Sequence, residues 1–340
     1  MTEEPVRHGL ATPAKKRRLR IALIATGSVF ALLLGSVGVY AFILAQKVDG
    51  VEKIVEAFPE ETLRPPVVVT EEPVAQNILL LGSDTRGSAS GSLDDAEGSR
   101  SDTMMVVHIS ADRKNIQVMS LMRDFWVDIP GYGMAKLNAA MSYGGVPLAV
   151  QTIEGIIDSR IDHVAMVDFQ GFEGITDALG GVTIDNPIAF NSSHMKGHRF
   201  EAGPIKLNGA EALAFVRERY AFQDGDYQRV RNQQAFIKAV MDKTLSRETL
   251  TNPVKISNLV SAIAPYMAVD GGLSSAYAAS LGFELRDIRL DDVSFFTMPS
   301  LGTGTEGNQS IVKVNWDEVP KIQKAFDDDT LGSYMPPTMP

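Results

Sequence analysis

Hydrophobic and polar positions alternate along the chain in ways that predict both strands and helices. Short apolar runs at residues 77–81, 103–109, 116–121 and 164–169 are typical of buried strands. Apolar residues at helical spacing predict helices at 136–143, 147–157, 171–179, 209–216 and 230–241. Asn208, with Glu211 three positions later, predicts a capped start for the helix at 209–216. Strands and helices that alternate in this way predict an α/β fold.

The amino-terminal part has a different pattern. Residues 21–45 contain no charge and follow a basic run at residues 15–20. A helix over this stretch would measure about 37 Å, enough to cross about 30 Å of hydrocarbon. The basic flank predicts a cytoplasmic amino terminus. A cleaved signal peptide is the alternative, but its apolar core would be shorter, and residues 39–41 are a poor cleavage site. We therefore expect a retained, single-pass signal anchor in the cell membrane.

These patterns predict five parts along the chain. They are a cytoplasmic basic tail at 1–20, a transmembrane anchor at 21–46, a stalk at 47–75, an extracellular domain at 76–328 and a flexible tail at 329–340. The stalk prediction rests on a short helical pattern that ends at Pro59 and on Pro65-Pro66, which favours an extended linker.

Composition narrows the classes of function. The net charge is −10, and because the first twenty residues are basic, the remainder is more acidic still. An acidic body argues against nucleic acid as a partner, since phosphate contacts need a basic surface. The chain has no cysteine, which excludes disulfides, thiolate nucleophiles and cysteine-ligated metals. Its histidines lack His-Glu-x-x-His spacing, and His194 and His198 flank a polar loop where we expect them to be solvated.

Arginines are concentrated in residues 215–240, FVRERYAFQDGDYQRVRNQQAFIKAV. Arg217 and Arg219 would share one side of an extended segment, and Arg229 and Gln233 lie one helical turn apart. Guanidinium groups gathered in this way suit phosphate or diphosphate. The alternative is a solvated charged turn, in which the acidic residues at 218, 224 and 226 pair with the arginines.

Three predicted strand ends each deliver an arginine and an aspartate to a loop. The pairs are Asp84/Arg86, Arg100/Asp102 and Arg123/Asp124. Asp84 and Asp102, at the ends of adjacent strands, are candidates to hold Mg²⁺ (or Mn²⁺) together with phosphate oxygens. A turn aspartate and an arginine-paired aspartate are the alternative. Arginines, two aspartates and apolar strands together describe phosphoryl transfer from a diphosphate.

Five segments resemble the LytR-CpsA-Psr family, in the same order and with similar spacing. They are NILLLGSDTR, RSDTMMVVHI, SLMRDFWVDIPGYGMAKLNAAMSYGG, IDHVAMVDFQGFEGITDALGGV and LNGAEALAFVRERY…DYQRVRNQQ. The resemblance implies a three-layer α/β/α domain whose central mixed sheet carries a polyprenyl-diphosphate lipid in an apolar tunnel. It also implies a glycopolymer phosphotransferase. Such an enzyme moves a phosphoglycan, teichoic acid for example, from that lipid to a peptidoglycan hydroxyl and releases polyprenyl phosphate.

The resemblance further implies roles for individual residues. Asp84 and Asp102 match the Mg²⁺-associated aspartates, and Asp102 is expected to help activate the incoming hydroxyl. The expected catalytic residues are Asp102, Arg123, Arg217 and Arg219. The expected substrate-binding residues are Arg86, Arg100, Asp124, Lys136, Asn138, Arg229, Arg231 and Gln233. Arg231 is included because Asn232 stands where family members often carry arginine.

Two other classes of function are open at this point. One is an envelope-associated regulator or attenuator, although about twenty cytoplasmic residues without a helix-turn-helix argue against direct DNA binding. The other is a polyprenyl-diphosphate-binding protein or pyrophosphatase that uses the same arginines without a glycan acceptor.

Overall fold

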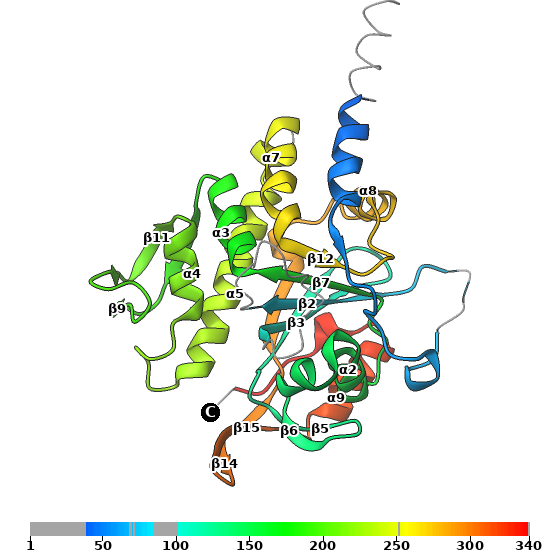
Figure 1. Ribbon diagram of the computed structural model, residues 1–340, viewed down its shortest axis with the longest axis vertical. Coiled ribbons are helices and arrows are strands. Elements are labelled where there is room, and N and C mark those ends of the chain that lie inside the picture. The colour runs from blue at the N-terminus through cyan, green and yellow to red at the C-terminus, as the bar shows by residue number, and fades with distance from the viewer. Residues whose placement is uncertain (1–38, 68–69, 71, 84–100, 251, 339–340) are drawn as a thin grey trace, which may run out of the picture. The chain divides into compact units, whose positions relative to one another are not determined.

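A computed structural model describes residues 39–67, 70, 72–83, 101–250 and 252–338 (Figure 1). The chain divides into two compact units, Met1–Gln46 and Lys47–Pro340. Most of the predicted anchor, residues 21–38, lies outside the described residues. Within the described ranges, no helix combines the length and the apolar character that a bilayer-spanning segment requires.

The second unit is built on a seven-stranded mixed sheet with the order β1-β12-β7-β2-β3-β4-β13. Strand β3 runs antiparallel to both of its neighbours, β2 and β4. Strand β7 runs parallel to β2, and β13 runs parallel to β4. The strands are β1 (Glu52–Lys53), β12 (Met267–Val269), β7 (His163–Asp168), β2 (Gln76–Ser83), β3 (Ser101–Ile109), β4 (Ile116–Leu121) and β13 (Val293–Thr297). The α/β class and the four apolar strands predicted from the sequence are therefore confirmed.

The central strands contain continuous apolar runs because helices pack on both faces of the sheet. In β2, Leu79 and Leu81 join one core, and Ile78 and Leu80 contact another. Successive strand residues point to opposite faces, so an unbroken apolar run indicates a sheet that is covered on both sides. Helices α2 (Ala139–Ile157) and α9 (Val319–Asp327) pack in the first core. Helices α5 (Gly225–Thr244) and α8 (Ser275–Glu284) contact the second.

A second group of helices lies beside the sheet, on the left in Figure 1. Helices α3 (Phe169–Ala178), α4 (Gly209–Arg217) and α5 enclose a cluster that includes Phe200, Phe215 and Phe236. Helix α4 begins with the predicted capping box of Asn208 and Glu211. The remaining α-helices are α6 (Arg247–Leu250) and α7 (Pro253–Ile263), and the 3₁₀ turns are η1 (Glu61–Leu63), η2 (Ala264–Tyr266), η3 (Leu290–Asp292) and η4 (Leu331–Ser333).

The sequence predicted a short strand at residues 182–184 but not the four two-stranded sheets. They are β5 (Trp126–Ile129) with β6 (Gly133–Lys136), β8 (Val182–Asn186) with β11 (Gly203–Leu207), β9 (Phe190–Asn191) with β10 (Arg199–Phe200), and β14 (Ser300–Glu306) with β15 (Gln309–Val314). The helix predicted to begin at residue 136 begins at Ala139 instead, and Lys136 ends β6 opposite Trp126. The tight β5–β6 turn uses Gly131 and Gly133, both at positive φ.

The segment predicted to be a stalk is partly built into the domain. Strand β1 pairs in parallel with β12, and Val51, Ile54 and Ala57 are buried. The prediction of a separate stalk at 47–75 therefore needs correction. A two-residue strand has no readable period, and its pairing partner lies more than two hundred residues away in the chain.

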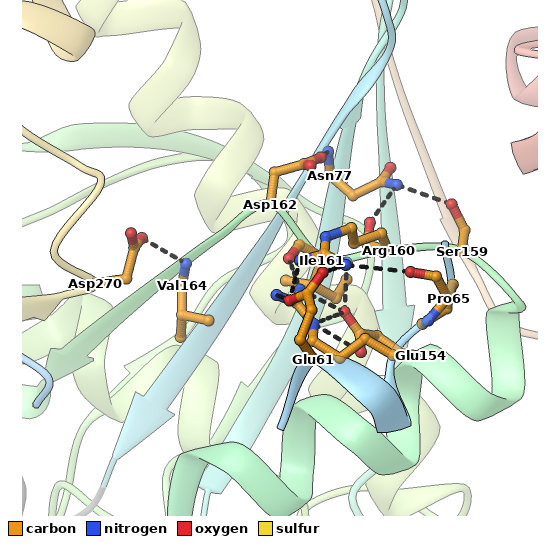
Figure 2. Close-up of polar contacts among 11 residues, drawn as sticks. Glu61, Pro65, Asn77, Glu154, Ser159, Arg160, Ile161, Asp162, Val164 and Asp270 are labelled. Carbon is orange, nitrogen blue, oxygen red and sulfur yellow. Dashed lines mark hydrogen bonds and ion pairs between the residues drawn. The ribbon is translucent and has the colours of Figure 1, made fainter. Parts of the chain in front are cut away.

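Polar contacts attach residues 61–65, which follow β1, to the rest of the domain (Figure 2). The Arg160 guanidinium donates to Glu61 and to the carbonyl oxygen of Pro65. The Arg64 guanidinium lies 2.7 Å from the Glu154 carboxylate, and both side chains are nearly inaccessible to solvent. Glu154 also accepts the backbone N–H of Ile161 at 2.9 Å. These contacts fix the chain that leads into β2, the strand that ends at the cavity described next.

Candidate functional site

A cavity of about 400 Å³ lies where β2, β3 and β7 meet helices α3, α4 and α5. Most of its wall is apolar. The side chains on this part of the wall include Phe172, Ile175, Leu213, Phe236, Ile237 and Val240. Four arginines and a glutamine also line it, namely Arg123, Arg217, Arg219, Arg229 and Gln233. The cavity therefore has two parts: an apolar chamber, lined by the side chains just named from α3, α4 and α5, and a positively charged region formed by the four arginines.

Local structure explains how these polar residues reach one place. Arg123 follows the end of β4, and Arg217 is the last residue of α4. Arg229 and Gln233 lie one turn apart on α5, so both project from the same face of that helix. Helix α5 is fixed to the sheet by Gln234, whose Nε2 donates to Ser120 Oγ at 2.9 Å. The chain thus brings together arginines that are up to 106 positions apart.

Arg217 differs from its neighbours in its surroundings. Its guanidinium carbon lies 4.5 Å from the centre of the Phe169 ring. No carboxylate of the described residues forms an ion pair with it. An aromatic face holds the cation in position without neutralising it. Within the described part of the chain, the charge of Arg217 is therefore available to an anionic ligand.

Asp226 joins the other two arginines of this segment. Its Oδ1 lies 2.8 Å from Nη2 of Arg229 and 3.6 Å from Nη1 of Arg219. Arg229 is almost entirely buried. A buried guanidinium needs a carboxylate in the free protein, because an uncompensated buried charge is costly. Asp226 thus holds two of the cavity arginines in place.

Asp124 forms an ion pair with Arg123. The Asp124 carboxylate lies 2.9 Å from the Lys136 ammonium and 3.4 Å from Nε of Arg123. Burial by itself would raise the pKa of Asp124, but the Lys136 hydrogen bond and the charges of Arg123, Lys136 and Arg229 together hold that pKa below its ordinary value. The backbone N–H of Asn138 donates to the Arg123 carbonyl oxygen at 3.0 Å. Asp124, Lys136 and Asn138 do not line the cavity, so their contacts position Arg123.

Arg231 does not reach the cavity that its neighbours line. Its guanidinium instead contacts Asp224 and Gln228. Two residues along a helix are rotated by about 200°, so a side chain two positions from Arg229 points away from it. Asn232 is buried, and its Nδ2 donates to the Phe215 carbonyl oxygen, which ties α5 to α4. The structure therefore places Arg231, which was expected to bind substrate, outside the cavity lining.

Two acidic residues in or near the cavity were not among the predicted site residues. Glu218 stands between Arg217 and Arg219 in the sequence, and its side chain is fully buried. Its carboxylate accepts hydrogen bonds from backbone N–H groups, including those of Ser193 at 2.6 Å and Tyr220 at 3.1 Å. Burial raises its pKa, but hydrogen bonds from Ser193 and Ala221 outweigh that effect and lower it. The predicted alternative, in which residue 218 pairs with the arginines, does not describe this contact.

Asp168 is the second of these residues. It lines the cavity at the end of β7, and its Oδ1 accepts the backbone N–H of Gly171 at 2.7 Å as the cap of α3. Burial raises the pKa of Asp168, although hydrogen bonds from the amides of Gly171 and Gln170 oppose that shift. An aspartate between an apolar strand and a helix is the signal that would have predicted this cap.

With this geometry in view, the chain can be compared with known proteins. The sequence profile of the LytR_cpsA_psr family matches residues 44–327. The chain belongs to the LytR-CpsA-Psr family. It is 32% identical, over 71% of its length and 77% of the relative's, to the polyisoprenyl-teichoic acid–peptidoglycan teichoic acid transferase TagU of Enterococcus faecalis. It is 30% identical, over 77% of its length and 57% of the relative's, to the cell wall biosynthesis protein LcpA of Corynebacterium glutamicum.

Solved structures of this family share the fold. Bacillus subtilis TagV superposes with a TM-score of 0.63 at 23% identity, over 78% of this chain and all of that one. A structure described as TagT bound to LI-WTA gives a TM-score of 0.62 at 24% identity, over 82% of this chain and all of that one. The seven-stranded mixed sheet is thus that of LytR-CpsA-Psr structures.

The remaining predicted site residues belong to the loop between β2 and β3. Asp84, Arg86 and Arg100 lie outside the described residues, and for Asp102 only the backbone, within β3, is described. Ser83, which precedes Asp84, pairs with Ser101, which precedes Asp102. Among the described residues, no group of three or more metal-ligating side chains occurs.

Proposed function

We propose that this protein is a transferase that moves a glycopolymer from a polyprenyl-diphosphate carrier to peptidoglycan. The observation that carries this proposal is the cavity, in which four arginines adjoin an apolar chamber. A polyprenyl diphosphate has the same two parts, a long apolar chain and a doubly anionic head. The curated relative TagU carries the corresponding activity in its name, polyisoprenyl-teichoic acid–peptidoglycan teichoic acid transferase.

The apolar chamber suits the lipid. Its wall includes aromatic and branched side chains from α3, α4 and α5. A cavity of about 400 Å³ falls within the usual range for small-ligand sites, about 300–1,000 Å³. Burying an isoprenoid chain there removes apolar surface from water, which contributes about 25 cal/mol per Å². The chamber would then hold the part of the polyprenyl chain nearest the diphosphate.

The arginines suit the diphosphate and the charge that develops during transfer. The hydroxyl oxygen of the acceptor attacks the phosphorus that bears the glycan, and the bond from that phosphorus to the bridging oxygen breaks. Polyprenyl phosphate leaves with the bonding electrons. Arg217 and Arg219 flank the head group from the end of α4, and Arg123 and Arg229 from β4 and α5. Fixed guanidinium groups stabilise negative charge on the phosphoryl oxygens without reorganising, which lowers the barrier.

Asp84 and Asp102 would hold Mg²⁺ or Mn²⁺, with the remaining positions filled by diphosphate oxygens and water. The donor set fits such an ion, because hard cations of this kind are bound by one or two carboxylates together with phosphate. The register of Ser83 with Ser101 supports this pairing of positions. When bound, the ion would neutralise charge on the diphosphate.

The amino-terminal part would anchor the enzyme next to its lipid substrate. Residues 21–45 have the length and the apolar character of a signal anchor, and the basic run before them favours a cytoplasmic amino terminus. The domain would then act outside the cell membrane, where peptidoglycan is assembled. Tethering raises the effective concentration of an enzyme near a substrate that is itself confined to the membrane.

The test uses the full-length protein reconstituted in liposomes with a polyprenyl-diphosphate-linked glycan. We expect glycan to appear on added peptidoglycan oligomers and polyprenyl phosphate to be released in equal amount. Glycan phosphate released to water, with none on the acceptor, would identify a pyrophosphatase instead. Binding of the donor without any turnover would identify a carrier-binding protein.

A further inference from the structure

The polar loop between β9 and β10 brings a histidine to the arginine-lined cavity. His194 lines the cavity, and its Nε2 lies 3.2 Å from the backbone carbonyl oxygen of Arg217. A carbonyl oxygen only accepts hydrogen bonds, so this contact assigns the ring hydrogen to Nε2. The lone pair of the neutral ring then lies on Nδ1. Among the residues that the structure describes, none is hydrogen-bonded to Nδ1. The expectation that His194 is simply solvated is therefore incomplete.

The loop that carries His194 is fastened to the segment that carries the arginines. The buried Glu218 carboxylate accepts the N–H and the hydroxyl of Ser193, at 2.6 and 2.8 Å. It also accepts the backbone N–H of Arg219 at 3.1 Å. On the loop itself, Ser192 Oγ accepts the backbone N–H of His194 at 3.1 Å. One carboxylate thus joins the loop to Arg219, and the imidazole is held against the Arg217 carbonyl.

This geometry places an imidazole beside the groups proposed to bind the diphosphate. The charged groups that face His194 are Glu218, at the end of α4, and the guanidinium groups of Arg217 and Arg219 across the same cavity. A proton acceptor for a hydroxyl must have a lone pair that is directed to the reacting group and not used elsewhere. His194 lines the cavity, and in the described part of the chain no hydrogen bond occupies its Nδ1.

We infer that His194 accepts the proton of the incoming hydroxyl and that Glu218 is its positioning residue. This inference rests on the proposed transferase function. As the hydroxyl oxygen forms its bond to the phosphorus, its proton passes to Nδ1, while the bond to the bridging oxygen breaks and polyprenyl phosphate leaves. His194 thereby takes the role that was expected of Asp102.

The test compares full-length His194→Gln with a matched control, His198→Gln, in the liposome transfer assay. His198 lies on the same loop, packs against the Phe200 ring and does not line the cavity. We expect His194→Gln to lower kcat by about 100-fold or more, with the KM for the lipid donor changed less than about threefold. His198→Gln should behave as the wild type.

The pH dependence supplies a second readout. In the wild type, kcat should fall as the pH decreases, because a protonated acceptor has no lone pair for the hydroxyl proton. His194→Gln should lose this acid limb. Glu218→Gln should lower kcat and keep the limb, since the imidazole is still present. Asp102→Asn should also keep it.

The outcomes separate this inference from the function on which it rests. Wild-type kcat in a folded His194→Gln protein, or a retained acid limb, overturns the role of His194 and leaves the transferase intact. A loss that appears only as weaker donor binding also overturns it, because His194 would then act as a cation toward the diphosphate. Absence of transfer by the wild type would instead count against the proposed function.

Discussion

Replacing Arg217 by alanine should nearly abolish transfer and leave the protein folded. Arg217 is the most informative of the cavity arginines because no carboxylate of the described residues depends on it for charge balance. Arg229→Ala, by contrast, would deprive Asp226 of an ion-pair partner at 2.8 Å. An activity loss in that variant would be confounded by a loss of stability.

The structure sets the expected magnitudes. The stability change arises mainly from the contact with Phe169 at 4.5 Å, which contributes about 0.5–1 kcal/mol at a partly exposed site. In a domain of this size, such a change lowers Tm by no more than about 4 °C. Removing one preorganised donor from developing phosphoryl charge costs about 10²–10³-fold in rate, or about 2.7–4 kcal/mol. The effect on activity should therefore exceed the effect on stability several-fold.

The assay measures polyprenyl phosphate release from a lipid-linked glycan in the presence of peptidoglycan oligomers, together with a thermal melt of each variant. Arg231→Ala is the matched control, because Arg231 lies on the same helix as Arg229 but contacts Asp224 and Gln228 and does not line the cavity. It should retain wild-type kcat/KM. The reasoning fails if Arg217→Ala keeps more than about a third of the activity, or if Arg231→Ala loses as much.

Three further predictions concern stability, the lipid chamber and pH. Glu154→Ala should lower the free energy of unfolding by about 3–5 kcal/mol, because it strands the buried Arg64 guanidinium; an unchanged urea midpoint would contradict this. Val240→Trp should slow turnover of a long-chain donor at least tenfold by filling the chamber and spare a short-chain, water-soluble diphosphate; equal losses for both donors would contradict the lipid assignment. Asp124 has a depressed folded pKa, so its contribution to stability is complete above its unfolded pKa of about 3.9 and is lost as pH falls through the folded value. Lys136→Met should flatten that acid dependence in urea titrations, whereas an unaltered pH profile would show that this ion pair is not its source.

Much of the fold was readable from local patterns. The run at residues 77–81 predicted a buried strand, and Asn208 with Glu211 predicted the start of α4, as found. These features depend on side-chain periodicity and on hydrogen bonds between residues close in the chain, so the sequence contains them. For Arg231, helical geometry and the family comparison gave different predictions. Helical rotation indicates that Arg231 points away from Arg229, as the structure shows, but the comparison at Asn232 favoured including Arg231 among the substrate-binding residues.

What the sequence determined by itself was therefore the inventory of the site: arginines at the ends of predicted elements, an apolar period beside them and the family motifs. What only the tertiary structure decided was their arrangement. Strand β1 joins a partner more than two hundred residues away, and Glu218 turns from its neighbouring arginines to the amides of a distant loop. That loop in turn brings His194 to the cavity. Such contacts join residues far apart in the chain, and no short-range period or turn preference encodes which of them meet.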